Sequence, residues 1–253
     1  MDVTKNTLWI NTLGRHADLY IGLPKDYETS DRSYPVLYMH DGQNVFNKQD
    51  SAYNMTWEVA NHFEADTSLP EVIIVALSSA KGTNRLDEYG PYAFTFNKAT
   101  HGGKGDSYVD YLVNELKPYI DATYRTKPEA KHTAIMGASM GGYISLYAAT
   151  KFPNVFARTA SLSGSFFLEK TRLISHLKAS TLSLLEKVYI DTGDDEVAGG
   201  TQEDYVFSNM DVYNYLRTVL PPNKLMFNVV AGGKHNENAW SKRFPDVLKF
   251  LFS

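Results

Sequence analysis

The segment that most restricts the fold of this chain runs from Lys131 to Pro153 and reads KHTAIMGASMGGYISLYAATKFP. The residues from His132 to Met136 have the apolar character of a short buried strand. Ile144, Tyr147 and Ala148 then recur at helical spacing. Almost no residues remain for a loop, so the segment predicts a strand that turns sharply into a helix.

Ser139 stands on this turn, with glycines at Gly137, Gly141 and Gly142 around it. A G-x-S-x-G pattern between a strand and a helix predicts a nucleophile elbow, in which the serine hydroxyl projects above the carboxyl edge of a parallel sheet. The backbone N–H of Met140 would then point toward the position of a developing oxyanion. The alternative is a glycine-rich turn with an ordinary serine, because the pattern also occurs by chance.

Length and composition limit the other possibilities. The 253 residues, of which 43% are apolar, can bury one large core, so we expect a single domain over residues 1–253. A net charge of −4 without runs of like charge argues against nucleic acid or an anionic membrane as partner. The chain has no cysteine, which excludes disulfides and thiolate chemistry. Because no export signal and no long apolar run is visible, we expect a cytoplasmic protein.

Short apolar runs separated by helical patterns predict an α/β fold with a mostly parallel sheet of about eight strands and helices on both faces. The tight connection NTLGR predicts an antiparallel pair at one edge. A helix is expected over Asp106–Tyr124, kinked or broken by Pro118, and another in the apolar stripe from Trp240 to Leu251. The expected strands are Thr4–Ile10, Ala17–Leu23, Val36–Met39, Val72–Leu77, Thr133–Met136, Ala157–Leu162, Val188–Ile190 and Leu225–Val230.

A nucleophilic serine needs a base and a third group that orients the base. In a fold of this class the chain order is serine, acid, histidine. His235 is the one histidine that follows a late strand and precedes the final helix. Of the acids that follow Gly193, a turn back toward the sheet favours Glu196, with Asp195 as second choice. The alternative is that all three acids, Asp194 included, form a solvated loop.

The second oxyanion donor is expected in the loop that follows Val36–Met39, where the sequence reads HDGQN. Gly42 allows the backbone to turn inward, so the N–H of Gln43 is the candidate, beside that of Met140. Alternatively, Asp41 and Asn44 only brace a tight turn with their side chains. No histidine pair has a metal-binding spacing, and nothing calls for a metal or a cofactor.

Several residues near strand ends are candidates for a substrate pocket. Phe166 and Phe167 lie in SGSFF, and Trp240 follows the candidate base by five residues, although each is equally suited to the core. The segment NRLDEYGPYAFTF is expected to be a loop near the mouth of the site. Within it, an ion pair between Arg85 and Glu88 is favoured over a substrate contact. No long insertion is present that would form a large lid.

Six segments in combination resemble one family from about Tyr20 onward. They are YPVLYMHDGQNVF, RLDEYGP, YLVNELKPYIDATYRT, AIMGASMGGYISLYAATKFP, YIDTG and GGKHNENAW. They are similar to the esterase family of the α/β-hydrolase superfamily. That family includes esterase D-like S-formylglutathione hydrolases, feruloyl and acetyl-xylan esterases, siderophore esterases and mycolyltransferases.

The resemblance implies the α/β-hydrolase fold and a serine carboxylesterase. It implies Ser139, an acid near Glu196, and His235 as the triad, with Gln43 and Met140 as oxyanion donors. We expect small soluble acyl esters as substrates. The alternatives are siderophore lactones, feruloyl or acetyl sugar esters, and thioesters, of which glutathione thioesters are disfavoured because the chain lacks cysteine. A non-catalytic binding module is a remote alternative, since every element of the site is present.

Overall fold

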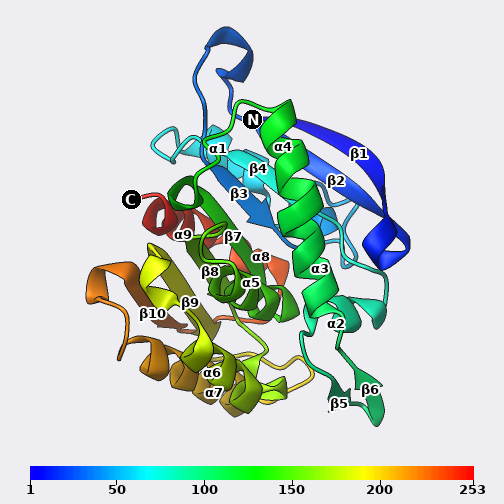
Figure 1. Ribbon diagram of the computed structural model, residues 1–253, viewed down its shortest axis with the longest axis vertical. Helices are drawn as coiled ribbons and strands as arrows, with labels where there is room; N and C mark the ends of the chain where they lie inside the picture. The colour runs from blue at the N-terminus through cyan, green and yellow to red at the C-terminus, as the bar shows by residue number, and fades with distance from the viewer.

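An eight-stranded sheet runs through the middle of the protein, and helices cover both of its faces (Figure 1). The computed structural model describes every residue from 1 to 253. The strand order is β1-β2-β4-β3-β7-β8-β9-β10; β2 runs antiparallel to both of its neighbours, and all other pairs are parallel. The strands are β1 (Asp2–Ile10), β2 (Arg15–Leu23), β3 (Val36–Met39), β4 (Ile73–Leu77), β7 (Thr133–Ala138), β8 (Arg158–Leu162), β9 (Lys187–Gly193) and β10 (Leu225–Val230).

This sheet confirms the α/β-hydrolase prediction, including the antiparallel pair at one edge. The largest difference in strand length is in β9, which continues past Ile190 to Gly193. The apolar run stops at Ile190, but Asp191 and Thr192 remain fully buried in the strand and pair in register with β10. The predicted end of the strand at Ile190, which was based on the polarity of the next residues, is therefore too early.

Two apolar cores lie on opposite faces of the sheet. The larger is covered by α3 to α7, and the smaller by α1, α8 and α9 (Figure 1). The carboxyl ends of the parallel strands are left at one edge, where loops can carry side chains toward a ligand. The helices are α1 (Val59–Ala65), α2 (Asn84–Tyr89), α3 (Gly105–Tyr111), α4 (Lys117–Thr123), α5 (Met140–Lys151), α6 (Lys170–Ala179), α7 (Gln202–Leu216), α8 (Glu237–Ser241) and α9 (Phe244–Leu251).

The helix expected over residues 106–124 forms as α3 and α4, which are joined by a π-helical turn at Leu112–Leu116. Pro118 lies in the first turn of α4. A proline has no N–H, and its ring presses on the preceding turn. The wider π turn accommodates both effects, so the helix continues past Pro118 in Figure 1 and does not end there, and the irregularity expected at the proline takes the form of this π turn.

The segment expected to be a loop near the site contains α2 and part of a hairpin. The hairpin consists of β5 (Phe94–Phe96) and β6 (Ala99–His101) and projects from the lower right of Figure 1. Its turn residues Asn97 and Lys98 both have positive φ, of 49° and 63°. The usual sequence of such a turn is Asn-Gly. Because a lysine stands here in place of the glycine, the sequence did not indicate a hairpin.

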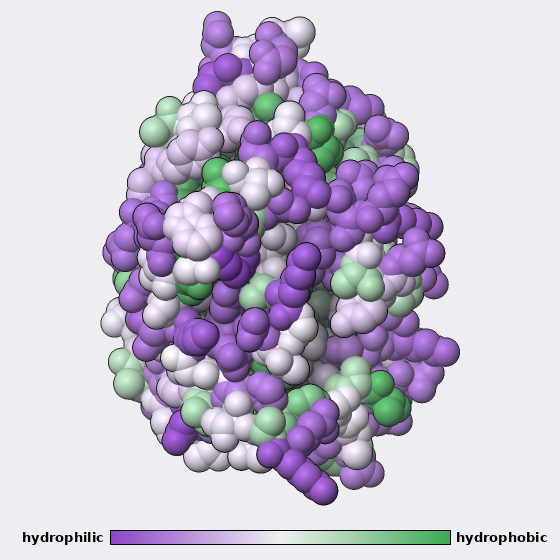
Figure 2. Space-filling view, turned by 90° about the vertical axis from the view of Figure 1, so that its right-hand side faces the viewer, coloured by the Kyte–Doolittle hydropathy of each residue, from purple (hydrophilic) through white to green (hydrophobic).

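On the face shown in Figure 2, hydrophilic side chains predominate and the apolar ones form small separate groups. No helix combines the length and the apolar character needed to cross a bilayer.

Candidate active site

Ser139 lies between β7 and α5 in a strained backbone conformation, with φ 60° and ψ −126°. Positive φ is uncommon for a residue that has a side chain, and it persists only where the surroundings impose it. Here the strand and the helix meet so closely that a Cβ on Gly137 would lie 2.8 Å from the backbone of Gly141. The small residues of the motif thus permit the sharp turn of a nucleophile elbow.

Two backbone N–H groups stand near this elbow without acceptors in their own turns. Met140 opens α5, and the first N–H groups of a helix have no intrahelical acceptor. Gln43 lies in the short 3-10 turn Gly42–Asn44, whose hydrogen bonds begin with the N–H of Asn44. Neither N–H is used by its own turn, so both remain the candidate oxyanion donors.

The inward turn of the Gln43 loop has a different origin from the expected one. The residue with positive φ is Asp41, at 55°, and not Gly42. Gly42 is needed for close packing, because a Cβ there would lie 2.6 Å from the carbonyl oxygen of Ala76 in β4. The loop is thus pressed against the neighbouring strand.

Glu196 is the acid that contacts the candidate base. Its Oε2 lies 3.2 Å from Nδ1 of His235, and its carboxylate is fully buried. Oε1 accepts hydrogen bonds from the N–H of Gly193, at 2.6 Å, and from the hydroxyl of Ser163. The turn after β9 therefore returns its third residue to the sheet.

The two other acids of this turn point elsewhere. Asp195 is exposed and lies 3.8 Å from Lys234. Asp194 accepts a hydrogen bond of 2.6 Å from the N–H of Gly232, which ties the acid loop to the histidine loop. Neither acid contacts His235.

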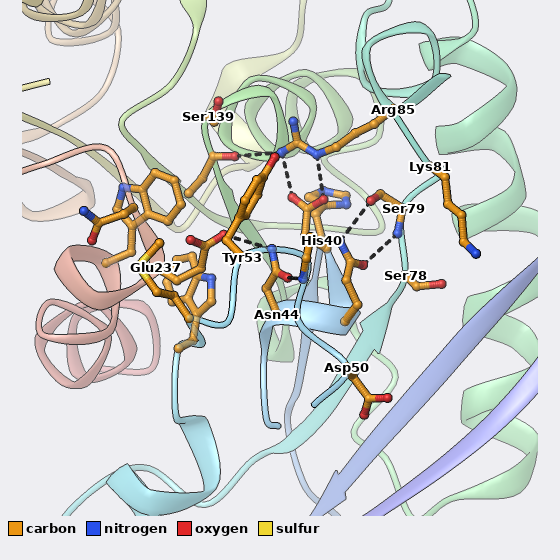
Figure 3. A pocket seen from close by; sticks show the side chains of 18 of the residues that line it. His40, Asn44, Asp50, Tyr53, Ser78, Ser79, Lys81, Arg85, Ser139 and Glu237 are labelled. Atoms are coloured by element: carbon orange, nitrogen blue, oxygen red, sulfur yellow. Dashed lines mark hydrogen bonds and ion pairs between the residues drawn. The ribbon is translucent and has the colours of Figure 1, made fainter. Parts of the chain in front are cut away.

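Ser139 and His235 line the same cavity, but no hydrogen bond joins their side chains. The hydroxyl of Ser139 instead lies 3.1 Å from that of Ser165. In the view of Figure 3, the Ser139 hydroxyl points away from the labelled cavity residues. Formation of a serine–histidine hydrogen bond therefore requires rotation of the Ser139 side chain.

Two aromatic rings pack against the imidazole of His235. Its centroid lies 4.7 Å from the Tyr205 ring and 4.9 Å from the Trp240 ring, the latter arranged edge to face. The Tyr205 hydroxyl donates to the carbonyl of Ala198, and burial raises the pKa of this phenol to about 12. Sequence reasoning missed Tyr205, because an aromatic residue in the first turn of α7 gives no local signal of a role in the site.

The cavity has a volume of about 880 Å³ and extends from Ser139 toward β2 and the loops that follow β3 and β4 (Figure 3). Only nine of its 26 lining residues are hydrophobic, so a polar molecule suits it better than a long acyl chain. Its polar wall includes Lys5, Asp18, Gln43, Asn44, Gln49, Asp50, Ser78, Ser79, Lys81, Asn236 and Glu237. Its aromatic wall consists of Tyr20, Tyr53, Trp57 and Trp240.

The expected ion pair between Arg85 and Glu88 does not form. Arg85 makes two contacts with the carboxylate of Asp41, at 2.6 and 2.7 Å, while Glu88 pairs with Arg15. Because the segment is helical, Arg85 points into the cavity and Glu88 toward β2. Burial opposes the charge of Asp41, but Arg85 outweighs it and lowers the pKa of this carboxyl.

The two phenylalanines do not line the cavity. Phe166 is fully buried in the larger core and packs edge to face on Tyr143. Phe167 packs on Tyr205. Both rings follow a strand end, but the short turn after β8 directs them toward the helices. Of the expected pocket residues, Trp240 and Arg85 do line it.

His40 is a further cavity residue that the sequence analysis did not single out. Its Nδ1 lies 2.7 Å from the Tyr108 hydroxyl, and its Nε2 has no partner. Burial lowers the pKa of His40 to about 3, with Asp41 opposing and Arg85 adding to the shift. This imidazole therefore stays neutral, and it lies beside the loop that carries Gln43.

A mostly parallel sheet with a strained serine between a central strand and the following helix is the architecture of the α/β-hydrolases. Residues 10–251 match the model of the family described as "Putative esterase", and the chain belongs to that family. The protein is thus an esterase with the α/β-hydrolase fold.

Individual proteins show the same relationship. The chain is 26% identical to the uncharacterized protein YbbA of Bacillus subtilis. The aligned 237 residues cover 91% of this chain and 90% of that protein. A ferulic acid esterase structure superposes with a TM-score of 0.73 at 20% identity, over 98% of each chain. The enterochelin esterase of Shigella flexneri superposes with a TM-score of 0.76 at 18% identity, over 99% of this chain and 58% of that one. At such identities these structures establish the fold alone.

Proposed function

We propose that the protein hydrolyses small soluble carboxylic esters through a Ser139–His235–Glu196 triad and a covalent acyl-enzyme. The observation that carries the proposal is the contact between the His235 ring and the buried Glu196 carboxylate, on the cavity wall that also holds the elbow serine. A histidine held in this way has Nδ1–H directed to the acid, which leaves Nε2 free to act as a base.

Acylation begins when the Ser139 hydroxyl rotates from Ser165 toward His235. Nε2 of His235 accepts the proton while the serine oxygen attacks the ester carbonyl carbon. The carbonyl oxygen becomes negative and accepts hydrogen bonds from the N–H groups of Met140 and Gln43. Collapse of this intermediate expels the alcohol, which takes its proton from the imidazolium.

Deacylation repeats the sequence with water. His235 removes a proton from the water molecule, the hydroxide attacks the acyl carbonyl, and the two N–H groups again hold the oxyanion. The C–O bond to Ser139 breaks, and the serine oxygen regains a proton from His235. Glu196 stabilises the imidazolium in both halves of the reaction.

The cavity favours a polar substrate. Lys81, Ser78 and Gln43 offer donors, while Glu237 and Asp50 offer acceptors, and all five line the same cavity as Ser139 (Figure 3). Aromatic walls beside these groups also fit a sugar ring or a phenol. Esters of sugars with phenolic or acetyl groups, and siderophore lactones, are therefore the second candidates.

Labelling with a fluorophosphonate probe tests the mechanism, because only an activated serine reacts. We expect the label on Ser139 by peptide mapping, and none on the Ser139→Ala variant. The same variant should lose p-nitrophenyl butyrate hydrolysis by about four to six orders of magnitude. Label at another residue, or a variant as active as the parent, would refute the triad.

A substrate panel separates the candidate substrates. Short aliphatic esters, methyl ferulate, an acetylated xylo-oligosaccharide and a trilactone should be compared by kcat/KM, which reports the fit to each transition state. We expect short esters with a polar alcohol to rank first. A preference of a hundredfold or more for the ferulate or the trilactone would reassign the substrate and leave the mechanism in place.

A further inference from the structure

We propose that Ser163 is a positioning residue whose hydroxyl fixes both Glu196 and Trp240 against the ring of His235. This inference rests on the proposed function, since it concerns the same triad. Ser163 itself lies behind the acid and would not touch the substrate: it is fully buried and is absent from the cavity wall.

The backbone at Ser163 is held in an unusual conformation. It is the first residue after β8, and its φ is 50°. Its N–H donates to the carbonyl of Asp191, at 2.9 Å, and lies 3.2 Å from the carboxylate of the same residue. A non-glycine residue is retained at positive φ only where its surroundings impose it, and such outliers gather at functional sites. The contacts around Ser163 therefore hold its backbone, and with it the side chain, in one position.

The partners of the Ser163 hydroxyl determine where its proton points. Nε1 of Trp240 lies 2.8 Å away and Nη2 of Arg243 lies 3.4 Å away. Indole and guanidinium groups can only donate hydrogen bonds, and a hydroxyl has one proton and two lone pairs. Both lone pairs face these donors, so the proton is given to the third neighbour, the carboxylate of Glu196.

Two of the hydrogen-bond partners of Ser163, Glu196 and Trp240, both contact the imidazole of His235. Through Glu196, the hydroxyl fixes the acceptor of the His235 Nδ1–H. Through Trp240, it fixes the ring that packs edge to face on His235 at 4.9 Å. Loss of the hydroxyl removes a donor from the acid and the acceptor from the indole at once. Glu196 and Trp240 then gain freedom to move.

A buried ion pair connects the Ser163 hydroxyl to the sheet. Arg243, which donates to Ser163, also lies 2.7 Å from the carboxylate of Asp191. Asp191 sits in β9, which leads directly into the loop of Glu196. The position of the Ser163 oxygen is therefore set from β8, from β9 and from the segment before α9.

A pair of variants separates positioning from packing. Ser163→Ala removes the hydroxyl and keeps the strained φ, whereas Ser163→Gly removes the hydroxyl and relieves the strain. We expect the glycine variant to unfold at the higher temperature of the two. We expect both to lose about 10- to 100-fold in kcat with KM within twofold of the parent. Ser145→Ala is the matched control, because its buried hydroxyl bonds only the Gly141 carbonyl of its own helix, and it should keep parental kcat.

A spectroscopic signature reports the histidine directly. The Nδ1–H of a histidine bonded to a carboxylate gives a downfield proton resonance, which the His235→Gln variant would identify by its absence. We expect this resonance in the parent and in Ser145→Ala, and its loss or upfield shift in both Ser163 variants. A Ser163→Gly protein with parental kcat and an unchanged resonance would overturn the positioning role.

The rate of fluorophosphonate labelling distinguishes failure of the proposed function from failure of the positioning role. If the parent is not labelled at Ser139, the proposed function itself fails. If the parent is labelled and the Ser163→Gly protein reacts at the same rate, the function stands and the positioning inference fails. We expect labelling of the variant to slow by the same factor as kcat.

Discussion

The hydroxyl of Ser139 lies 3.1 Å from the hydroxyl of Ser165 and makes no hydrogen bond to His235. A hydrogen bond of this kind contributes about 1 kcal/mol, so it holds the nucleophile out of line with its base at a modest cost. In the proposed mechanism, attack on an ester requires the serine to leave Ser165. The contact is then a resting arrangement of the proposed nucleophile.

Replacement of Ser165 by alanine removes the competing partner. We expect kcat/KM for p-nitrophenyl butyrate to stay at the parental value or to rise by up to about fivefold, the equivalent of one such hydrogen bond. Steady-state kinetics of Ser165→Ala beside the parent provide the measurement. A loss of tenfold or more would show instead that the Ser165 hydroxyl assists the reaction.

Separate replacement of Glu196 and of Asp195 by the corresponding amide tests which carboxylate belongs to the proposed triad. In Glu196→Gln the His235 ring loses its charged partner, and we expect kcat to fall by about a thousandfold or more. Asp195→Asn alters an exposed side chain near Lys234 and should keep kcat within twofold of the parent. A Glu196→Gln enzyme with near-parental turnover would reject the assignment.

Gly42→Ala tests the second oxyanion donor without changing any polar group. The added Cβ would meet the backbone of β4 at 2.6 Å, so the loop carrying Gln43 must move. Loss of one oxyanion donor typically lowers kcat by about a hundredfold or more, and we expect that loss with little change in KM. Circular dichroism must show a folded variant, and parental kcat in a folded variant would contradict the role of this loop.

The buried His40 makes folding stability dependent on pH. Its pKa is about 3 in the folded protein, chiefly because of burial, and about 6.5 in an unfolded chain. Between these values the unfolded state binds the extra proton. The stabilising contribution is therefore complete above pH 6.5 and is lost as the pH falls toward 3, by up to about 1.4 kcal/mol per pH unit.

Urea unfolding at pH 7, 6, 5 and 4 measures this effect. The free energy of unfolding of the parent should fall steadily over this range, and that of His40→Asn should fall less steeply, because asparagine does not titrate. The variant will be less stable at pH 7, so the slope with pH is the quantity to compare. Equal slopes would show that His40 is protonated in the folded state or is accessible to water.

Local patterns were sufficient for the fold and for the sharp strand–helix turn that carries Ser139. The glycines around Ser139 indicate a turn too tight for larger side chains, and the apolar runs indicate strands covered on both faces. Both features depend on residues that are neighbours in the sequence. The same holds for His235, which stands in the glycine-containing loop after β10. These predictions depended on the fixed chain order of a known type of sheet.

Side-chain partners could not be obtained in this way. Arg85 pairs with Asp41 because α2 turns it toward a loop 44 residues earlier in the chain, and Glu88 faces Arg15 on β2. Phe166 looked like a pocket wall but enters the core. In each case the outcome depends on the direction in which an element leaves the sheet.

The sequence by itself determined that a sharp strand–serine–helix turn exists and that an acid and a histidine follow late strands. Only the tertiary structure decided that Glu196 meets the imidazole, that Ser139 rests on Ser165, and that Ser163 joins the acid to Trp240. The physical reason is that sterics act between neighbours in the chain, whereas hydrogen bonds form between whichever groups the packed sheet brings within about 3 Å.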